Sequence, residues 1–324
     1  MVTAVPPEVI HIGSACRDIA PDDPRGWRLG GGVTYSALTT ARLGLRTAAV
    51  VGVDDEARHA SELDLLREAG ADLLIVPLSA GPIYHNVETP AGRVQTIAQK
   101  GVPLPVPPLP ESWIAARAWM VAPVADEVHD EWIAPIPDGA FVAVAWQGLL
   151  RNLVDGERVT RKPPRASALI RRADVVGVSH HDVAPETPLR ELWSLLRPGA
   201  VLAVTQGHEG GLLLTLGADG PIQTLRWRAT LSDREVDPTG AGDTFLSALV
   251  ATAAHPNIGG RQRTLLDLRV AAAAGSLVVE DWGLAGVPDR AQVITRLVRE
   301  RVRRIFGPAR ADTVGSYAPH EGKQ

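Results

Sequence analysis

The sequence predicts an α/β fold in which a mostly parallel central sheet is flanked by helices and carries a small β lid. Three observations predict it. Short apolar runs alternate with helix-like stretches along most of the 324 residues, an order typical of a parallel sheet covered on both faces. The hydrophobic fraction of 45% suits one large core. A break in the alternation, at residues 83–100, has the pattern of an inserted hairpin.

Seven apolar runs are predicted as buried strands, because each is short, continuous and bounded by polar or turn-forming residues. They are residues 9–15, 47–53, 71–78, 118–124, 141–146, 173–179 and 201–207. Helices are predicted at residues 34–44, 55–70 and 187–199, where apolar side chains recur at helical spacing. Because helical stretches lie between the strands, the strands are expected to run parallel.

The predicted hairpin consists of two β-like segments around a Pro-Ala-Gly turn, and its position between sheet strands suits a lid. The insertion is placed at about residues 81–102. The proline-rich residues 101–110 follow it as a semi-rigid connector. Residues 1–306 are therefore expected to form one domain with this lid, and residues 307–324, which have little apolar content, a flexible tail.

Composition excludes several classes of partner. Charged residues make up 22% of the chain and the net charge is −4, so electrostatics favour neither nucleic acid nor an anionic membrane. The first residues lack the basic flank and apolar run of a signal peptide, and no stretch reaches the roughly 18 apolar residues of a membrane span. The lone Cys16 cannot form an internal disulfide. A soluble cytoplasmic protein is expected.

The most informative stretch is "DPTGAGDTFLSALV", residues 237–250. Proline and glycine forbid a regular strand there, and apolar residues then recur at helical spacing, so a helix is predicted to begin near Ala241 or Gly242. The first-turn amides of a helix have no internal partner, and the macrodipole makes that end attractive to anions such as phosphate. Asp243 lies directly in this turn.

Two roles are open for Asp243. In one, it is a first-turn carboxylate that stabilises its helix, as in many proteins. In the other, it points with the amides toward a bound phosphate and accepts the proton of an attacking hydroxyl. The turn taken alone favours the first role.

Three motifs together resemble the ribokinase-like, or PfkB-type, carbohydrate kinases. "DPTGAGDTF" is similar to that family's C-terminal signature, "LGGGVTYSALTTARLG" (residues 29–44) to its paired-glycine motif, and "VTQGHEGG" (residues 204–211) to its nucleotide-binding Thr-x-Gly-x-x-Gly. The motifs occur in the family's order, and the resemblance covers about residues 8–300. It implies an ATP-dependent kinase that requires Mg²⁺ and acts on a small sugar or polyol.

The resemblance also implies roles for individual residues. Asp243 corresponds to the catalytic base, and the amides of Gly240, Ala241 and Gly242 to the group that stabilises the transferring phosphoryl group. The nucleotide contacts correspond to Thr205, Gly207 and Gly210, although this stretch also fits a β-hairpin turn. The sugar site corresponds to Gly31, Gly32 and Asp18, which is expected at the end of the first strand; a plain strand-to-helix turn and a solvated loop charge are the alternatives.

The sequence departs from the family at two polar segments. The family's Asn-x-x-Glu, which helps to hold Mg²⁺ through water, is replaced by "SHHD", so Asp182 is the expected metal-binding carboxylate and the asparagine amide is lost. "AWQGLLR" resembles an Asp-x-Gln-Gly-x-x-Arg segment, with Ala145 in place of the aspartate. Gln147 and Arg151 are expected to contact substrate or phosphate; for Arg151, an exposed loop charge is the alternative.

Substrate choice is expected to involve Tyr35, which stands where ribokinases have asparagine. An aromatic residue there resembles the inositol kinases, and an apolar ring face suits a cyclic polyol. The alternative is that Tyr35 packs within its helix. The first expectation for function is therefore phosphorylation of an inositol-like polyol or sugar, with a nucleoside or ribose kinase, or a ligand-binding regulator without turnover, as alternatives. A homodimer formed through the lid is also expected.

Overall fold

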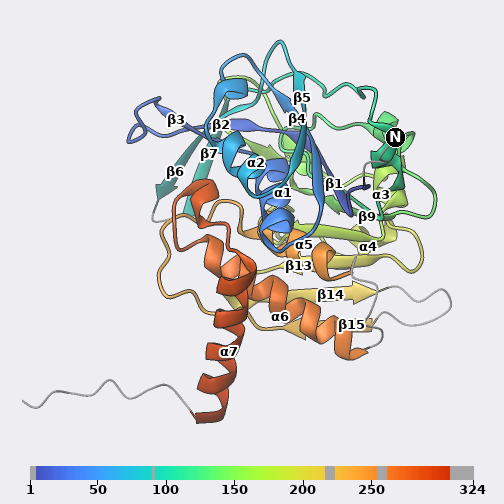
Figure 1. Ribbon diagram of the computed structural model, residues 1–324, viewed down its shortest axis with the longest axis vertical. Coiled ribbons are helices and arrows are strands. Elements are labelled where there is room, and N and C mark those ends of the chain that lie inside the picture. The colour runs from blue at the N-terminus through green and yellow to red at the C-terminus, as the bar shows by residue number, and fades with distance from the viewer. Residues whose placement is uncertain (1–4, 90–91, 216–222, 254–260, 307–324) are drawn as a thin grey trace, which may run out of the picture.

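The structure, a computed structural model, describes residues 5–89, 92–215, 223–253 and 261–306. Its centre is a nine-stranded sheet (Figure 1) in the order β15-β14-β13-β12-β9-β8-β1-β4-β5. Neighbouring strands are parallel except β14, which is antiparallel to both β13 and β15. The strands are β1 (Val9–Ser14), β4 (Thr47–Val53), β5 (Asp72–Pro77), β8 (Ala118–Val121), β9 (Phe141–Ala145), β12 (Val175–Ser179), β13 (Val201–Thr205), β14 (Gly211–Thr215) and β15 (Gln223–Trp227).

The central strands are continuous apolar runs because helices cover both faces of the sheet. On one face the core contains Trp119, Trp132 and Leu192, beside α3 (Ala168–Arg172) and α4 (Leu189–Ser194). The opposite face packs against the longer helices, which are α1 (Gly32–Arg42), α2 (Glu62–Glu68), α5 (Ala241–Ala253), α6 (Arg261–Val278) and α7 (Arg290–Phe306). The distal end of α7 projects away from the body (Figure 1). No helix in the described part of the chain is long and apolar enough to cross a membrane.

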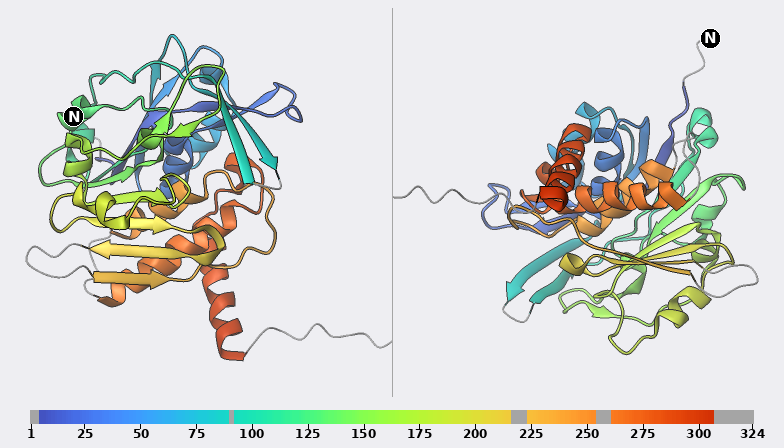
Figure 2. Two further views of the ribbon diagram at one scale, coloured as in Figure 1. Left: turned by 180° about the vertical axis from the view of Figure 1, so that it is seen from behind. Right: turned by 90° about the horizontal axis from the view of Figure 1, so that it is seen from below.

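The predicted hairpin is confirmed as β6 (Ile83–Thr89) and β7 (Gly92–Gln99), which project from the body (Figure 2). Its sheet has two further strands that sequence reasoning did not anticipate, β2 (Cys16–Ile19) and β3 (Trp27–Gly30). The order is β3-β2-β6-β7, and this four-stranded sheet is called the lid below. A separate pair, β10 (Arg151–Asn152) and β11 (Thr160–Arg161), lies in the segment that follows β9.

The predicted strands all form, and the helices differ mainly in their ends. Residues 55–70 form a short 3-10 turn at Ala57–His59 and then α2, rather than one helix. α5 begins at Ala241 as expected. The proline-rich residues 101–110 form neither helix nor strand. The predicted tail at residues 307–324 lies outside the described residues.

Candidate active site

Two helix N-termini meet at the carboxyl ends of the central strands. β1 leads through the lid to α1, which begins at Gly32, and the turn at residues 237–240 leads into α5. A methyl group placed on Gly32 would lie only 2.9 Å from Oδ1 of Asp243 and 3.1 Å from the carbonyl oxygen of Ala122, which follows β8. The glycine is therefore required by close approach, and it brings the Asp243 carboxylate against the first turn of α1.

This position lies where the sheet reverses its winding direction. From β1 the chain proceeds to β4 and β5 on one side, and then returns to β8, β9, β12 and β13 on the other. In open α/β sheets, ligands bind outside the carboxyl ends of the strands at such a point. The N-termini of α1 and α5 add a preference for anionic groups, because the helix dipole makes this end of each helix partially positive.

The Asp243 carboxyl is half-buried and has an unusual electrostatic setting. Burial raises its pKa to about 6, the Arg151 guanidinium lowers it, and the Asp182 carboxylate raises it. Arg151 and Asp182 therefore both lie within electrostatic range of Asp243. These three residues, which the sequence placed in separate motifs, are brought together by the fold.

Gly240 holds the turn before α5 in a shape that excludes a side chain. Its φ is +78°, and an added methyl group would lie 2.2 Å from the ring of Tyr35. Tyr35, on α1, is 2% exposed, and burial together with the nearby carboxylates of Asp237 and Asp18 raises its pKa. The Tyr35 ring thus packs against the turn that precedes α5. This contact favours the alternative that Tyr35 is an interior packing residue rather than a substrate contact.

Asp182 is oriented by neighbours on two loops. Its Oδ1 accepts a hydrogen bond from Nε2 of Gln147 at 3.0 Å, and its Oδ2 accepts one from the backbone N–H of Ser179 at 2.8 Å. Gln147 therefore contacts the expected metal-binding carboxylate. Among the described residues, no group of three His, Cys, Asp or Glu side chains is arranged to hold a metal ion. A single oriented carboxylate fits Mg²⁺, which is usually held by one or two carboxylates together with substrate phosphates.

The expected nucleotide contacts occupy the next strand along the same edge. Thr205 ends β13 and lies beside Ser179 in the parallel register, and its carbonyl oxygen accepts the backbone N–H of His180 at 3.0 Å. Gly207 and Gly210 lie in the turn between β13 and β14, so the hairpin alternative is confirmed, and the nucleotide contact stays a prediction. Gly210 is buried, and an added methyl group would lie 2.2 Å from the carbonyl oxygen of Trp227.

Asp18 is not at the end of the first strand, as expected, but within the separate lid strand β2. The chain leaves β1 at Ser14 and enters the lid two residues later. Asp18 Oδ1 accepts a hydrogen bond from Nδ2 of Asn86 on β6 at 3.1 Å. Its carboxylate also covers Gly30, where an added methyl group would lie 2.2 Å from Oδ2. The neighbouring Gly31 caps α1 with φ of 105°.

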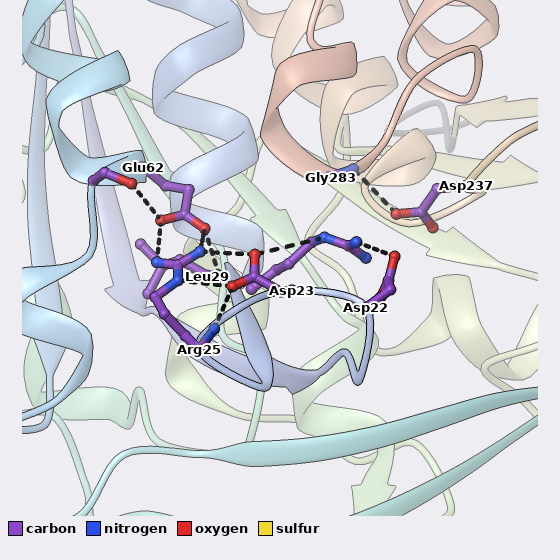
Figure 3. Close-up of polar contacts among 9 residues, drawn as sticks. Asp22, Asp23, Arg25, Leu29, Glu62, Asp237 and Gly283 are labelled. Carbon is purple, nitrogen blue, oxygen red and sulfur yellow. Dashed lines mark hydrogen bonds and ion pairs between the residues drawn. The ribbon is translucent and has the colours of Figure 1, made fainter.

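The β2–β3 half of the lid is tied to the body by charged contacts (Figure 3). Arg25, in the loop between these strands, forms a two-pronged contact with Glu62 of α2, at 2.6 and 2.7 Å, and also binds Asp23. Glu62 accepts the backbone N–H of Leu29 on β3 at 3.1 Å. In the same figure, Asp237 accepts the backbone N–H of Gly283 at 3.2 Å, which connects the turn before α5 to the segment after α6.

Sequence reasoning missed Glu127, which is 2% exposed. Its carboxylate accepts backbone N–H groups of Ser14, Val124 and Ala125 at 2.7 to 3.2 Å. Burial raises its pKa, although these hydrogen bonds act in the opposite direction. The residue joins the end of β1 to the loop after β8 at the edge of the site. Nothing in "APVADEVHD" distinguishes a buried glutamate from an exposed one.

Comparison with known proteins agrees with this arrangement. Residues 164–290 match the pfkB family carbohydrate kinase model. No curated protein matches the chain.

Solved structures with the same fold include three that carry ligands or activities of interest. A pyrophosphate-dependent kinase in the ribokinase family, complexed with a pyrophosphate analog and myo-inositol, is 18% identical, with 88% of this chain and 99% of that chain covered and a TM-score of 0.63. Arabidopsis thaliana ribokinase, complexed with ribose and ATP, is 18% identical, with 90% and 98% covered and a TM-score of 0.61. Methanocaldococcus jannaschii nucleoside kinase is 14% identical, with 90% and 98% covered and a TM-score of 0.63.

The fold is therefore that of the ribokinase family over nearly its whole length. The part of the chain that contains Asp182, the turn after β13 and Asp243 is the part that the family model matches. The chain therefore has a ribokinase-like fold, and its residues 164–290 are similar to the pfkB carbohydrate kinase family.

Proposed function

We propose that this protein is a phosphotransferase with an alcohol group as acceptor, which uses ATP to phosphorylate a hydroxyl of a small carbohydrate or cyclic polyol. The observation that carries the proposal is the position of the Asp243 carboxylate at the meeting of two helix N-termini, with Arg151 and Asp182 in electrostatic range. A helix-stabilising carboxylate requires none of these neighbours. A base, an anion-binding turn and a nearby cation are what phosphoryl transfer requires.

In the proposed reaction, Asp243 accepts the proton of the acceptor hydroxyl while its oxygen forms a bond to the γ-phosphorus. The bond between that phosphorus and the β,γ-bridging oxygen breaks, so ADP leaves and the acceptor carries the phosphate. The amides of Gly240, Ala241, Gly242 and Asp243 stabilise the charge on the transferring group, and Arg151 adds a positive charge. No covalent intermediate with the protein is involved.

Asp182 is proposed to hold Mg²⁺ through water, and the ion would neutralise charge on the donor phosphates. The hydrogen bonds from Gln147 and Ser179 support this role, because together they hold the carboxylate in one orientation. Thr205, Gly207 and Gly210 are proposed as nucleotide contacts. They lie next to the Asp182 loop through the pairing of β12 with β13.

The proposed acceptor site includes Asp18, Gly31 and Gly32, and the buried Tyr35 is proposed to shape it indirectly, by supporting the turn at Gly240. Asp18 supports it most directly, because its carboxylate is held by Asn86 and faces the glycine turn that leads to α1. An inositol-like polyol is the first proposal for the substrate. The neighbour complexed with myo-inositol agrees with it, while the ribokinase and nucleoside kinase neighbours favour the alternative, a ribose or nucleoside kinase.

The test is a panel of polyols, sugars and nucleosides incubated with Mg²⁺ and ATP, with the phosphorylated product identified by mass. The same panel is run with pyrophosphate, because one neighbour is a pyrophosphate-dependent kinase. A product with ATP is expected. If product forms with pyrophosphate but not with ATP, the phosphate donor is pyrophosphate rather than ATP. If ATP and an acceptor bind but no product forms, the protein is better described as a ligand-binding regulator without catalytic turnover.

A further inference from the structure

Arg151, the positive charge in range of Asp243, is held by the lid rather than by the central sheet alone. It is the first residue of β10 and directly follows the 3-10 turn at Gln147–Leu150. Its Nη1 donates a hydrogen bond to the carbonyl oxygen of Val124 at 3.1 Å. Tyr84 of β6 donates to the same oxygen at 2.8 Å, and the Arg151 guanidinium lies 5.3 Å from the centre of the Tyr84 ring. Two side chains from different elements thus share one acceptor.

A second attachment runs through the backbone. Residues 153–160, called the strap here, follow Arg151 and lie along the outer edge of β7. The N–H of Gly156 donates to Ile97 at 2.7 Å, the N–H of Ile97 donates to Glu157 at 3.0 Å, and the N–H of Val159 donates to Gln95 at 2.8 Å. These bonds extend the lid sheet by one segment and cover its edge. Arg151 therefore continues directly into a segment paired with the lid.

The side chains around this junction are closely packed. Tyr84 is 1% exposed and lies in one apolar cluster with Cys16, Ile97, Val124 and Ala125. A guanidinium over an aromatic face gains more when water is excluded. The position of Arg151 is therefore determined by contacts that depend on where β6 and β7 lie.

We propose that Tyr84 and the strap are positioning elements of the catalytic site, which hold the Arg151 guanidinium in range of Asp243 as long as the lid keeps this position. The catalytic meaning of the inference depends on the proposed function. The link between the lid contacts and the position of the Arg151 charge does not depend on the proposed function.

The link is measurable through the titration of Asp243. The groups that act on this carboxyl, or are acted on by it, come from three elements: Arg151 at the start of β10, Asp182 after β12 and Tyr35 on α1. Of these three, Arg151 is the cation. If the Arg151 guanidinium moves away, the ionised Asp243 carboxylate loses the attraction of a nearby positive charge, so the pKa of Asp243 should rise.

The experiment is a carbon-13 NMR titration of the aspartate carboxyls in the full chain, with the Asp243 signal identified by its loss in Asp243→Asn. Tyr84→Leu, which removes the ring and its hydroxyl, should raise the pKa of Asp243 by about one unit, the lower end of the effect of an opposite charge on a carboxyl. Tyr84→Phe keeps the ring and should shift it less. Val87→Ala, on the same strand but at a side chain that is 42% exposed, should cause no shift.

Two further variants make the result decisive. Val159→Pro removes the strap N–H that donates to Gln95 and leaves Tyr84 itself in place, although the Val159 side chain packs against the margin of the Tyr84 cluster. It should raise the pKa of Asp243 in the same direction even if Tyr84→Leu fails to fold. In an Arg151→Gln background, Tyr84→Leu should cause no additional shift. An unchanged pKa in Val159→Pro and in any folded Tyr84→Leu protein, or an undiminished Tyr84→Leu shift without Arg151, would overturn the inference. A shift in a protein that phosphorylates nothing would leave the inference intact and refute the proposed function.

Discussion

At the scale of single residues, the chemistry depends on opposing influences on Asp243. Burial raises the pKa of its carboxyl to about 6, while the Arg151 guanidinium limits the rise. A general base works best when its pKa lies near the operating pH, because it is then both ionised and able to hold a proton. Asp243 meets this condition better than an exposed aspartate.

The first prediction concerns the pH dependence of catalysis. Because only the ionised Asp243 can accept the hydroxyl proton, kcat/KM should fall as pH decreases through about 6, and should approach a tenfold loss per pH unit below it. Initial rates at low acceptor concentration measure this profile. A profile that is level through this range would show that no group with this pKa acts as the base.

The second prediction concerns stability. The folded-state pKa of Asp243 is raised above the ordinary aspartate value of 3.8, so the folded protein loses stability as pH increases from about 4 through 6, where this carboxyl ionises in the folded state. Asp243→Asn removes that cost. It should raise the Tm at pH 7.5 by about 2–4 °C, the effect of roughly 1 kcal/mol in a domain of similar size.

The advantage of Asp243→Asn should disappear near pH 4, where the carboxyl of the wild type is protonated in both states. Thermal unfolding across this pH range tests the sign directly. A Tm difference that stays constant with pH would mean that the substitution acts through packing instead.

At the scale of elements, the turn before α5 and the helix α1 have to fit each other. Gly240 has a positive φ and lies against the Tyr35 ring, whereas a methyl group on Gly242 would meet nothing within 4 Å. The two glycines of this motif therefore meet different structural requirements. Gly240 shapes the turn, and Gly242 leaves open space above the helix N-terminus.

The third prediction uses this contrast. Gly240→Ala combines a left-handed backbone with overlap on Tyr35 and should destabilise the protein by about 2–5 kcal/mol. Gly242→Ala, the matched control, should be neutral or stabilise by up to about 1 kcal/mol, because alanine favours the helix. Denaturant unfolding of both variants gives the comparison. Equal losses would contradict the role assigned to the Tyr35 ring.

The fourth prediction separates the two roles of Tyr35. If its ring only supports the turn, Tyr35→Asn should lower kcat for every acceptor by a similar factor. If the ring contacts a cyclic polyol, the same variant should change the preference between inositol and ribose by roughly 1–3 kcal/mol. The burial of Tyr35 against Gly240 leads us to expect the uniform loss. Competition between the two acceptors measures the ratio.

Local sequence signals predicted those elements whose residues form continuous patterns. The buried strands and the β6–β7 hairpin follow from periodicity, and the start of α5 follows from its glycine turn. β2 was missed because it is four residues long and contains Arg17 and Asp18, so it has no apolar pattern. The burial of Glu127 and the contact of Gln147 with Asp182 were missed because both depend on loops that only the folded sheet brings together.

At the scale of the whole molecule, the lid and the body meet through contacts of different kinds. The β2–β3 half is held by ion pairs such as Arg25 with Glu62 and Arg17 with Asp54, and the β6–β7 half by Tyr84 and the strap. Because the strap covers the outer edge of β7, the expected homodimer through the lid would have to use β3 or a face of the sheet rather than that edge.

The most direct measurement of the central claim compares wild type and Asp243→Asn in single-turnover phosphoryl transfer to the best acceptor from the panel, together with the binding affinities of donor and acceptor. A neutral amide keeps the shape of the carboxyl but cannot accept the hydroxyl proton. Transfer should therefore slow by about 10²- to 10⁴-fold, while both affinities stay within a few fold of wild type. Transfer at more than half the wild-type rate would contradict the assignment of Asp243 as the base.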